Sequence, residues 1–215
     1  YGILITAGDN DSFPVWYAQQ VEGVRPDVTI ALIPYLNMEW YAHQLIRERV
    51  SAYDGSGVAS YAKIAGKQPT GPVISLTRAQ ADSLPPYLQL QQPVSFQQGN
   101  INATIPAGYI MRDQLMVLQF IRDVFPARPI HFSIGPYAQS LGLGEYVVTQ
   151  GLTQKLLDGK ASDNPAYVKF PGGYIDVERT RELGAKYQAP AALLKQGRWL
   201  DDASAVAQLR TLFGQ

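Results

Sequence analysis

The hydrophobic pattern of the chain begins with a short apolar run that stops at a polar turn. Residues 2–7 are apolar on both faces and predict a central, parallel strand. Polar residues after Gly8 break the run, and Ser12 is predicted to cap a helix that carries Pro14 in its first turn. A second apolar strand is expected over 28–33, which completes a βαβ unit with a right-handed crossover.

Apolar residues at helical spacing predict most of the remaining elements. Helices are expected over residues 38–50, 77–82, 112–125, 145–157, 176–187 and 201–213. The helix over 145–157 would bury Val148 or Thr149, Leu152 and Leu156. Strands are expected over 73–76, 94–96, 102–105 and 130–134.

Glycine and proline residues concentrate between the second predicted helix and the strong helix at 112–125, which indicates a loop-rich insertion over 51–105. The predicted fold is therefore α/β: a three-layer domain with a short, mostly parallel, Rossmann-like sheet over residues 1–157. A helical C-terminal extension is expected over 158–215.

Composition narrows the possible partners. Charged residues make up 17% of the 215 residues, against about 25% in an average domain, and 13 tyrosines are present. This favours a surface that a partner covers, or a tyrosine- and glutamine-rich secreted surface. The net charge is zero without a basic run, so no nucleic-acid partner is expected. No apolar stretch is long enough to span a membrane. Because the chain opens on a strand at Tyr1, we expect a fragment or processed product.

The turn after the first strand is the candidate ligand site. Asp9, Asn10 and Asp11 supply clustered oxygen atoms, which suit a hard cation or sugar hydroxyls. The alternative is structural: Asp9 and Asn10 hold the turn, and Asp11 or Ser12 caps the helix. The structural interpretation is favoured, since three ligands from one loop do not complete a metal shell.

Four aromatic residues near the predicted βα turns are candidates for contacts. Trp16, Tyr17, Trp40 and Tyr41 would form core or interface anchors, or alternatively a platform on which sugars stack. His43 and His131 lack partners at metal-ligand spacing, and His131 is expected to be a satisfied, buried histidine. No nucleophile elbow, Walker A or dinucleotide fingerprint is present. The sequence therefore assigns no catalytic, cofactor-binding or metal-binding residue.

Several segments together resemble one family. The most specific is the run Gly8-Asp9-Asn10-Asp11-Ser12-Phe13-Pro14, and the others cover residues 21–28, 36–41, 128–132, 143–146 and 150–152. They resemble the soluble C-terminal domain of bacterial multi-spanning membrane proteins related to the protein O-mannosyltransferases of the glycosyltransferase C superfamily. The resemblance covers roughly residues 2–157. It implies that glycosyl transfer takes place in the membrane portion and that the soluble domain lies on the extracytoplasmic side.

Two functions are open. The favoured one is a non-catalytic extrinsic subunit or domain, periplasmic and peripheral to the inner membrane, which binds and stabilises an integral membrane protein complex. That complex is the parent glycosyltransferase or a respiratory or photosynthetic assembly. The alternative is a sugar- or acceptor-binding lobe of a protein O-mannosyltransferase-like membrane glycosyltransferase, with Asp9, Asn10 and Asp11 as its contact.

Overall fold

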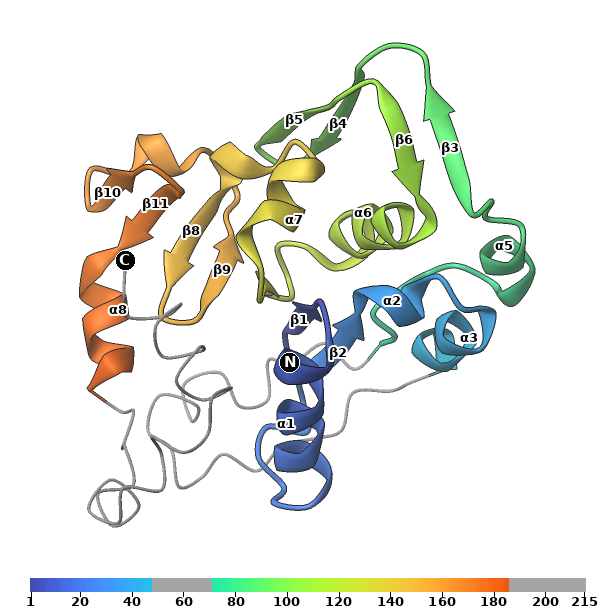
Figure 1. Cartoon of the computed structure of the whole chain (residues 1–215), viewed down its shortest axis with the longest axis horizontal. Helices are drawn as coiled ribbons and strands as arrows, with labels where there is room; N and C mark the ends of the chain where they lie inside the picture. Colours follow the sequence, from blue (N-terminus) through green and yellow to red (C-terminus); the bar gives the residue numbers. More distant parts are fainter. Residues whose placement is uncertain (48–70, 186–215) are drawn as a thin grey trace.

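A seven-stranded mixed sheet organises the computed structural model, which describes residues 1–47 and 71–185 (Figure 1). The strands follow the order β10-β11-β8-β9-β7-β1-β2. Their bounds are β1 (Ile3–Thr6), β2 (Thr29–Leu32), β7 (Ile130–Phe132), β8 (Val147–Gln150), β9 (Thr153–Leu156), β10 (Tyr167–Phe170) and β11 (Gly173–Asp176).

The sheet is not mostly parallel, so the predicted three-layer, Rossmann-like fold is wrong. Only one end of the sheet has the expected arrangement: β1 lies between β2 and β7, parallel to both, with Leu4 opposite Ile30 and His131. Beyond β7, β9 pairs antiparallel with β7 and with β8, and β11 is parallel to β8 but antiparallel to β10. Short turns join β8 to β9 and β10 to β11, and such turns leave no room for the crossover helices of a doubly wound sheet.

The segment predicted as a helix over 145–157 is instead the hairpin of β8 and β9. Val147, Val148 and Thr149 are β-branched and suit a strand. Gly151 has a positive φ of 63° and provides the turn, while Leu152, expected on the buried stripe, is 46% exposed at the tip. Val148 and Leu156 are both buried, as a helix would also have placed them.

Several helices agree with the prediction. The helices are α1 (Asp9–Gln20), α2 (Ile33–Leu36), α3 (Glu39–Arg47), α5 (Arg78–Asp82), α6 (Arg112–Val124), α7 (Gly135–Ser140) and α8 (Val177–Gly184), with 3₁₀ turns η1 (Gly144–Tyr146) and η2 (Ala161–Asp163). Thr77 caps α5 by accepting a hydrogen bond from the Gln80 amide, and Asp176 caps α8 in the same way from Arg179. The helix predicted over 201–213 lies outside the described residues.

The main core lies between the sheet and α6. This helix buries Met116, Val117, Phe120 and Ile121 completely, and Phe132 at the centre of the sheet is equally buried. The helix combines a polar first turn with an apolar stripe, so one side is removed from water and stabilises the sheet by burial.

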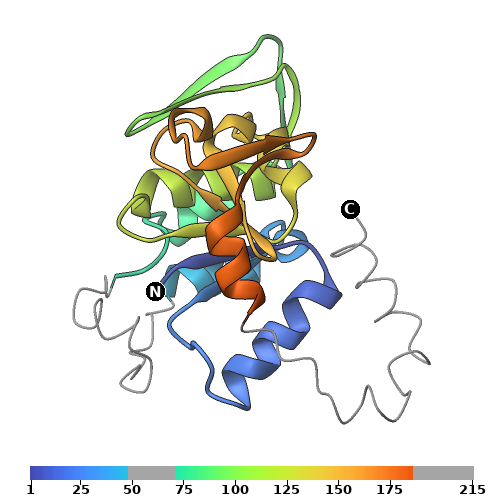
Figure 2. The ribbon, with the colours of Figure 1, turned by 90° about the vertical axis from the view of Figure 1, so that its left-hand side faces the viewer.

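A long β-ribbon begins within the insertion predicted over 51–105 and ends just beyond it. Its four strands are β3 (Tyr87–Leu90), β4 (Val94–Gln98), β5 (Ile101–Ile105) and β6 (Gly108–Met111). Strand β3 pairs with β6 and β4 with β5, all antiparallel, and the ribbon projects away from the main sheet in both views (Figures 1 and 2). The strand expected over 73–76 is an extended segment that pairs with no strand of the described residues, and its Val73 and Ile74 enter the core.

The expected helical C-terminal extension is also mixed. Before α8, residues 167–176 form β10 and β11, which join the main sheet through the pairing of Ile175 with Thr149. Tyr167, Val168 and Phe170 carry a β propensity that the surrounding polar and glycine residues obscure in the sequence.

A substitution at Gly151 distinguishes the observed hairpin from the predicted helix. We expect Gly151→Ala to lower the free energy of unfolding by about 1 kcal/mol, because alanine is strained at positive φ. In a helix, the same change would stabilise by roughly that amount. Urea unfolding followed by circular dichroism measures the difference. As a control, Leu152→Ser should cost no more than about 0.5 kcal/mol at this exposed tip. A stabilising Gly151→Ala would contradict the hairpin.

Candidate functional site

The polar turn after β1 is held by the carboxylate of Asp11. It accepts hydrogen bonds from the backbone amides of Ala7 (2.9 Å) and Gly8 (2.8 Å), and the Ser133 hydroxyl donates to it from the end of β7. Burial tends to raise the pKa of Asp11, but these three donors outweigh it and hold the pKa below its ordinary value. The N-terminus of α1, where phosphates bind in other α/β proteins, is thus filled by the chain's own carboxylate.

The predicted role of Ser12 as the helix cap is wrong. Gly8 is the N-cap, so α1 begins at Asp9 and Pro14 lies beyond the first turn. Ser12 is fully buried, and its hydroxyl donates to Thr6 Oγ1 over 2.7 Å. This bond fastens the helix to the end of β1 from the inside.

The three residues of the candidate ligand site do not act together. Asp11 turns inward, whereas Asp9 and Asn10 are exposed, and neither side chain hydrogen-bonds to another described residue. Within residues 1–47 and 71–185, no group of histidine, cysteine, aspartate or glutamate side chains could hold a metal ion. Asp9 and Asn10 therefore remain available to an external polar group, while Asp11 is committed to the turn.

Aromatic rings from α1, α2 and α3 form a continuous stack. Phe13 lies 5.8 Å from Trp16, Trp16 lies 6.1 Å from Tyr35, and Tyr35 lies 5.4 Å from Trp40, measured between ring centroids. We call Phe13, Trp16, Tyr35 and Trp40 the aromatic surface. Tyr41 contacts its inner side at 5.7 Å from Tyr35. Such stacked and tilted pairs contribute roughly 0.5–1.5 kcal/mol each beyond their burial.

The inner side of the stack rests on a core residue, whereas both of its ends are open to solvent. Tyr41 is 2% exposed, and its hydroxyl donates to the Ile30 carbonyl at 2.6 Å. By contrast, Trp40 is 54% exposed and Phe13 46%. Tyr17, which lies on α1 like Phe13, is 57% exposed and takes no part in the ring contacts. The structure thus brings together three of the four predicted aromatics.

Two members of the aromatic surface were missed by sequence reasoning. Phe13 lies inside the motif that was interpreted as a polar turn, and Tyr35 follows Pro34 at a predicted break. Their signal was the recurrence of aromatic residues after both β1 and β2, because the carboxyl ends of adjacent parallel strands lie at one edge of a sheet.

The two histidines have local partners. His43 Nε2 lies 2.6 Å from Asp82 Oδ1, which ties α3 to α5. His131 is partly buried between β1 and β9, with Nδ1 3.0 Å from Thr153 Oγ1. Burial, with a smaller contribution from Lys155, lowers the pKa of His131 to about 4, so the ring is neutral near pH 7.

A further polar group at the start of α6 is structural. The Tyr137 hydroxyl donates to Asp113 Oδ2 at 2.6 Å, and the Asp113 amide donates to Asn37 Oδ1 at 3.2 Å. Burial, reinforced by the Asp113 carboxylate, raises the pKa of Tyr137 far above its usual value. The phenol stays protonated and links α7 to α6, and through Asn37 to the end of α2.

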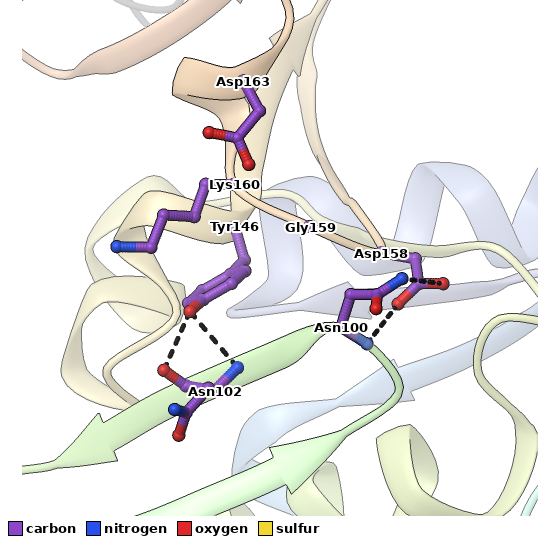
Figure 3. Close-up of a pocket in the computed structure, with 7 residues that line it drawn as sticks. All are labelled: Asn100, Asn102, Tyr146, Asp158, Gly159, Lys160 and Asp163. Carbon is purple, nitrogen blue, oxygen red and sulfur yellow. Dashed lines mark hydrogen bonds between the residues drawn. The ribbon is translucent and has the colours of Figure 1, made fainter.

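A polar cleft of about 530 Å³ lies between the β4–β5 turn and the segment after β9 (Figure 3). Tyr146 donates its hydroxyl to the Asn102 carbonyl at 2.8 Å, and the Asn100 amide donates to Asp158 at 2.8 Å. Lys160 pairs with Glu145 at 2.7 Å. These bonds fasten the β4–β5 turn to Tyr146 and Asp158 of the main domain, so the polar groups of the cleft are largely hydrogen-bonded to one another.

One comparison with known proteins is informative. Residues 1–65 match the family model of the TMEM260-associated domain 2. The chain matches no curated protein and no solved structure. The match links this segment to TMEM260. It supports a relation to a membrane protein and nothing more specific. It includes the turn at Asp11 and every residue of the aromatic surface.

No helix within residues 1–47 and 71–185 is both long enough and apolar enough to cross a lipid bilayer. For the described part of the chain, this agrees with the prediction that no segment spans a membrane.

Asp11 and Asn10, adjacent in sequence, should respond differently to alanine. We expect Asp11→Ala to lower the free energy of unfolding by about 2 kcal/mol, because three donors lose a charged acceptor. Asn10→Ala should change it by no more than about 0.5 kcal/mol. Urea denaturation of both variants tests this. Equal effects would show that the Asp11 bonds do not hold the turn.

His131 should make stability depend on pH. Its folded pKa of about 4 is below the ordinary 6.5, so the unfolded chain binds more protons between these values. Stability is fully present above pH 6.5 and falls toward pH 4, by at most about 1.4 kcal/mol per pH unit. Thermal unfolding of the protein and of His131→Gln across this range isolates the effect. Identical pH profiles would contradict it.

Proposed function

We propose that this chain is a non-catalytic domain that binds the extracytoplasmic face of an integral membrane protein and stabilises it through the aromatic surface. One observation carries the proposal: a preformed stack of partly exposed rings occupies the segment that matches the TMEM260-associated domain. Exposed aromatic residues and methionine are enriched in protein interfaces, and here Met38, 49% exposed, precedes Trp40.

The stack is suited to docking because its rings are already in place. Tyr41 anchors the inner end to β2 through the Ile30 carbonyl, and Tyr35 contacts both Tyr41 and Trp40. Because these side chains are already ordered, binding of a partner costs little conformational entropy, which favours affinity. Large aromatic anchors of this kind typically supply the dominant binding energy of an interface.

The polar groups whose pKa values are shifted also fit a structural role. Asp11, Tyr137 and His131 have shifted pKa values, and each makes a hydrogen bond that joins one element to another. Perturbed groups of this type are found in catalytic sites, but also in structural networks. Their hydrogen-bond partners within the chain favour the structural alternative.

The partner we propose is the membrane-embedded portion of a protein related to the O-mannosyltransferases. The resemblance of the Gly8–Pro14 motif and the name of the matching family both support a membrane-protein partner. The domain would then lie in the periplasm, peripheral to the inner membrane. A respiratory or photosynthetic assembly is the other partner of this class.

Binding to native membranes tests the proposal. The full chain should co-sediment with inner-membrane vesicles of its own cell, and Phe13→Ser/Trp40→Ser should weaken this at least about tenfold, the equivalent of one hot spot. The control Leu152→Ser/Val168→Ser removes apolar side chains of similar exposure from the other end of the sheet and should bind normally. Circular dichroism confirms that each variant is folded.

Two further samples identify the kind of partner. Vesicles whose outer proteins have been removed with trypsin should lose binding, and protein-free liposomes of the same lipids should not bind. Equal binding to liposomes, or no effect of Phe13→Ser/Trp40→Ser, would overturn the proposal.

A second candidate is a sugar- or acceptor-binding lobe of a membrane glycosyltransferase. The observation that favours it is the exposed pair Asp9 and Asn10, one helical turn before the exposed ring of Phe13. Free oxygen atoms beside an aromatic ring suit a saccharide. Asp9→Ala/Asn10→Ala would then abolish glycan binding in titration calorimetry, whereas membrane docking through Trp40 would be unchanged.

A further inference from the structure

The outer half of the β-ribbon has apolar side chains on both of its faces. Leu88 pairs with Ile110, so these two side chains share one face. Tyr87 pairs with Met111 and Gln89 with Tyr109, which puts the other large side chains on the opposite face. Tyr87, Tyr109 and Met111 are 55%, 65% and 44% exposed. A two-stranded ribbon has only marginal stability in water, so it depends on packing against the rest of the protein. The face that carries Leu88 and Ile110 packs in this way, and we call it the inner face.

An apolar groove of about 250 Å³ runs along the inner face of the ribbon. Its walls come from both halves of the ribbon, with Leu88 and Ile110 on one side and Val94 and Phe96 on the other. Its floor is the outward face of α6, where Leu115, Leu118, Gln119 and Arg122 recur at helical spacing. Leu88 and Val94 are each 42% exposed, so the groove is open to solvent.

A single cation lines this apolar groove. The Arg122 guanidinium lies 5.9 Å from the centroid of the Phe96 ring, which presents its face to the charge. Among the described residues, none accepts a hydrogen bond from Arg122 or forms an ion pair with it. The neighbouring carboxylate, Asp123, is occupied by the Ser75 amide (2.7 Å) and Gln119 (2.8 Å). Arg122 is thus free to pair with a carboxylate from outside.

We propose that this groove binds a segment of another protein that inserts one or two large apolar side chains and pairs an aspartate or glutamate with Arg122. The groove is smaller than the roughly 300–1,000 Å³ of a small-molecule pocket, so it suits side-chain anchors. Anchors in a desolvated pocket beside a polar rim are the usual centre of a peptide-binding site. The unpaired guanidinium supplies the charge selection.

This second surface is independent of the aromatic surface. The groove is formed by residues 84–122, outside the 1–65 match, and none of its lining residues belongs to α1, α2 or α3. The domain would therefore hold two partners, or two segments of one partner, on separate faces. Failure of docking through Trp40 has no bearing on the groove.

A displayed library of random 12-residue peptides, selected against the full chain, tests the proposal. We expect selected peptides to share two apolar residues near an aspartate or glutamate. Fluorescence anisotropy with the best peptide should show at least about tenfold weaker binding to Leu88→Glu and to Arg122→Glu. Tyr109→Glu changes the opposite face of the same ribbon and should bind normally. Circular dichroism establishes that the variants are folded.

Exchanging the charges of the peptide's acidic residue and of Arg122 is the decisive experiment. Replacing the peptide's acidic residue by lysine should weaken binding to the unchanged protein and restore it to Arg122→Glu. The proposal is overturned if no apolar-acidic motif is enriched, or if Leu88→Glu binds the peptide as well as the unchanged chain does. It is also overturned if sedimentation equilibrium shows a dimer that Leu88→Glu dissociates, since a second copy would then occupy the groove.

Discussion

The contact between Asp11 and Ser133 is the constraint on which the N-terminal half of the molecule depends. It joins the start of α1 to the residue after β7, two segments that follow the neighbouring parallel strands β1 and β7 but are 122 residues apart in sequence. The same carboxylate closes the turn after β1 through two backbone amides. Together with the buried hydrogen bond from Ser12 to Thr6, this charged side chain fixes the start of α1, and with it Phe13 and Trp16.

Elements with strong local signals could be predicted from the sequence. β1, β2 and α6 have long apolar patterns, and Thr77 and Asp176 mark helix starts because a cap depends only on residues three positions away. The hairpin of β8 and β9 could not be distinguished in this way. Val148 and Leu156 are eight residues apart and would lie on one side of a helix, whereas in the hairpin Leu156 pairs with Val147 and lies on the opposite face from Val148. Because both faces of the hairpin are covered there, both residues are buried in either arrangement. Only tertiary pairing with β7 decides between them.

The candidate site was predictable in its location but not in its organisation. The turn after β1 and the aromatic residues after β1 and β2 follow from strand-helix alternation. Which of three consecutive polar residues faces inward depends on Ser133, and nothing in the local sequence indicates that contact. The groove beneath the ribbon escaped prediction for a related reason: Leu88 and Val94 lie in a glutamine- and proline-rich stretch, and their partners on α6 come about 30 residues later.

The shallow attachment of α1 has a consequence for its motion. Along its twelve residues only Ser12 is fully buried. Its C-terminal half is held by the partly buried Trp16 and by two hydrogen bonds from Gln19 to the carbonyls of Arg25 and Val28, and buries no side chain fully. Segments with few buried contacts open locally at a fraction of the global unfolding free energy. A partner that covers Trp16 and Tyr17 would raise the energy of that opening, so association and the local order of α1 would be thermodynamically coupled.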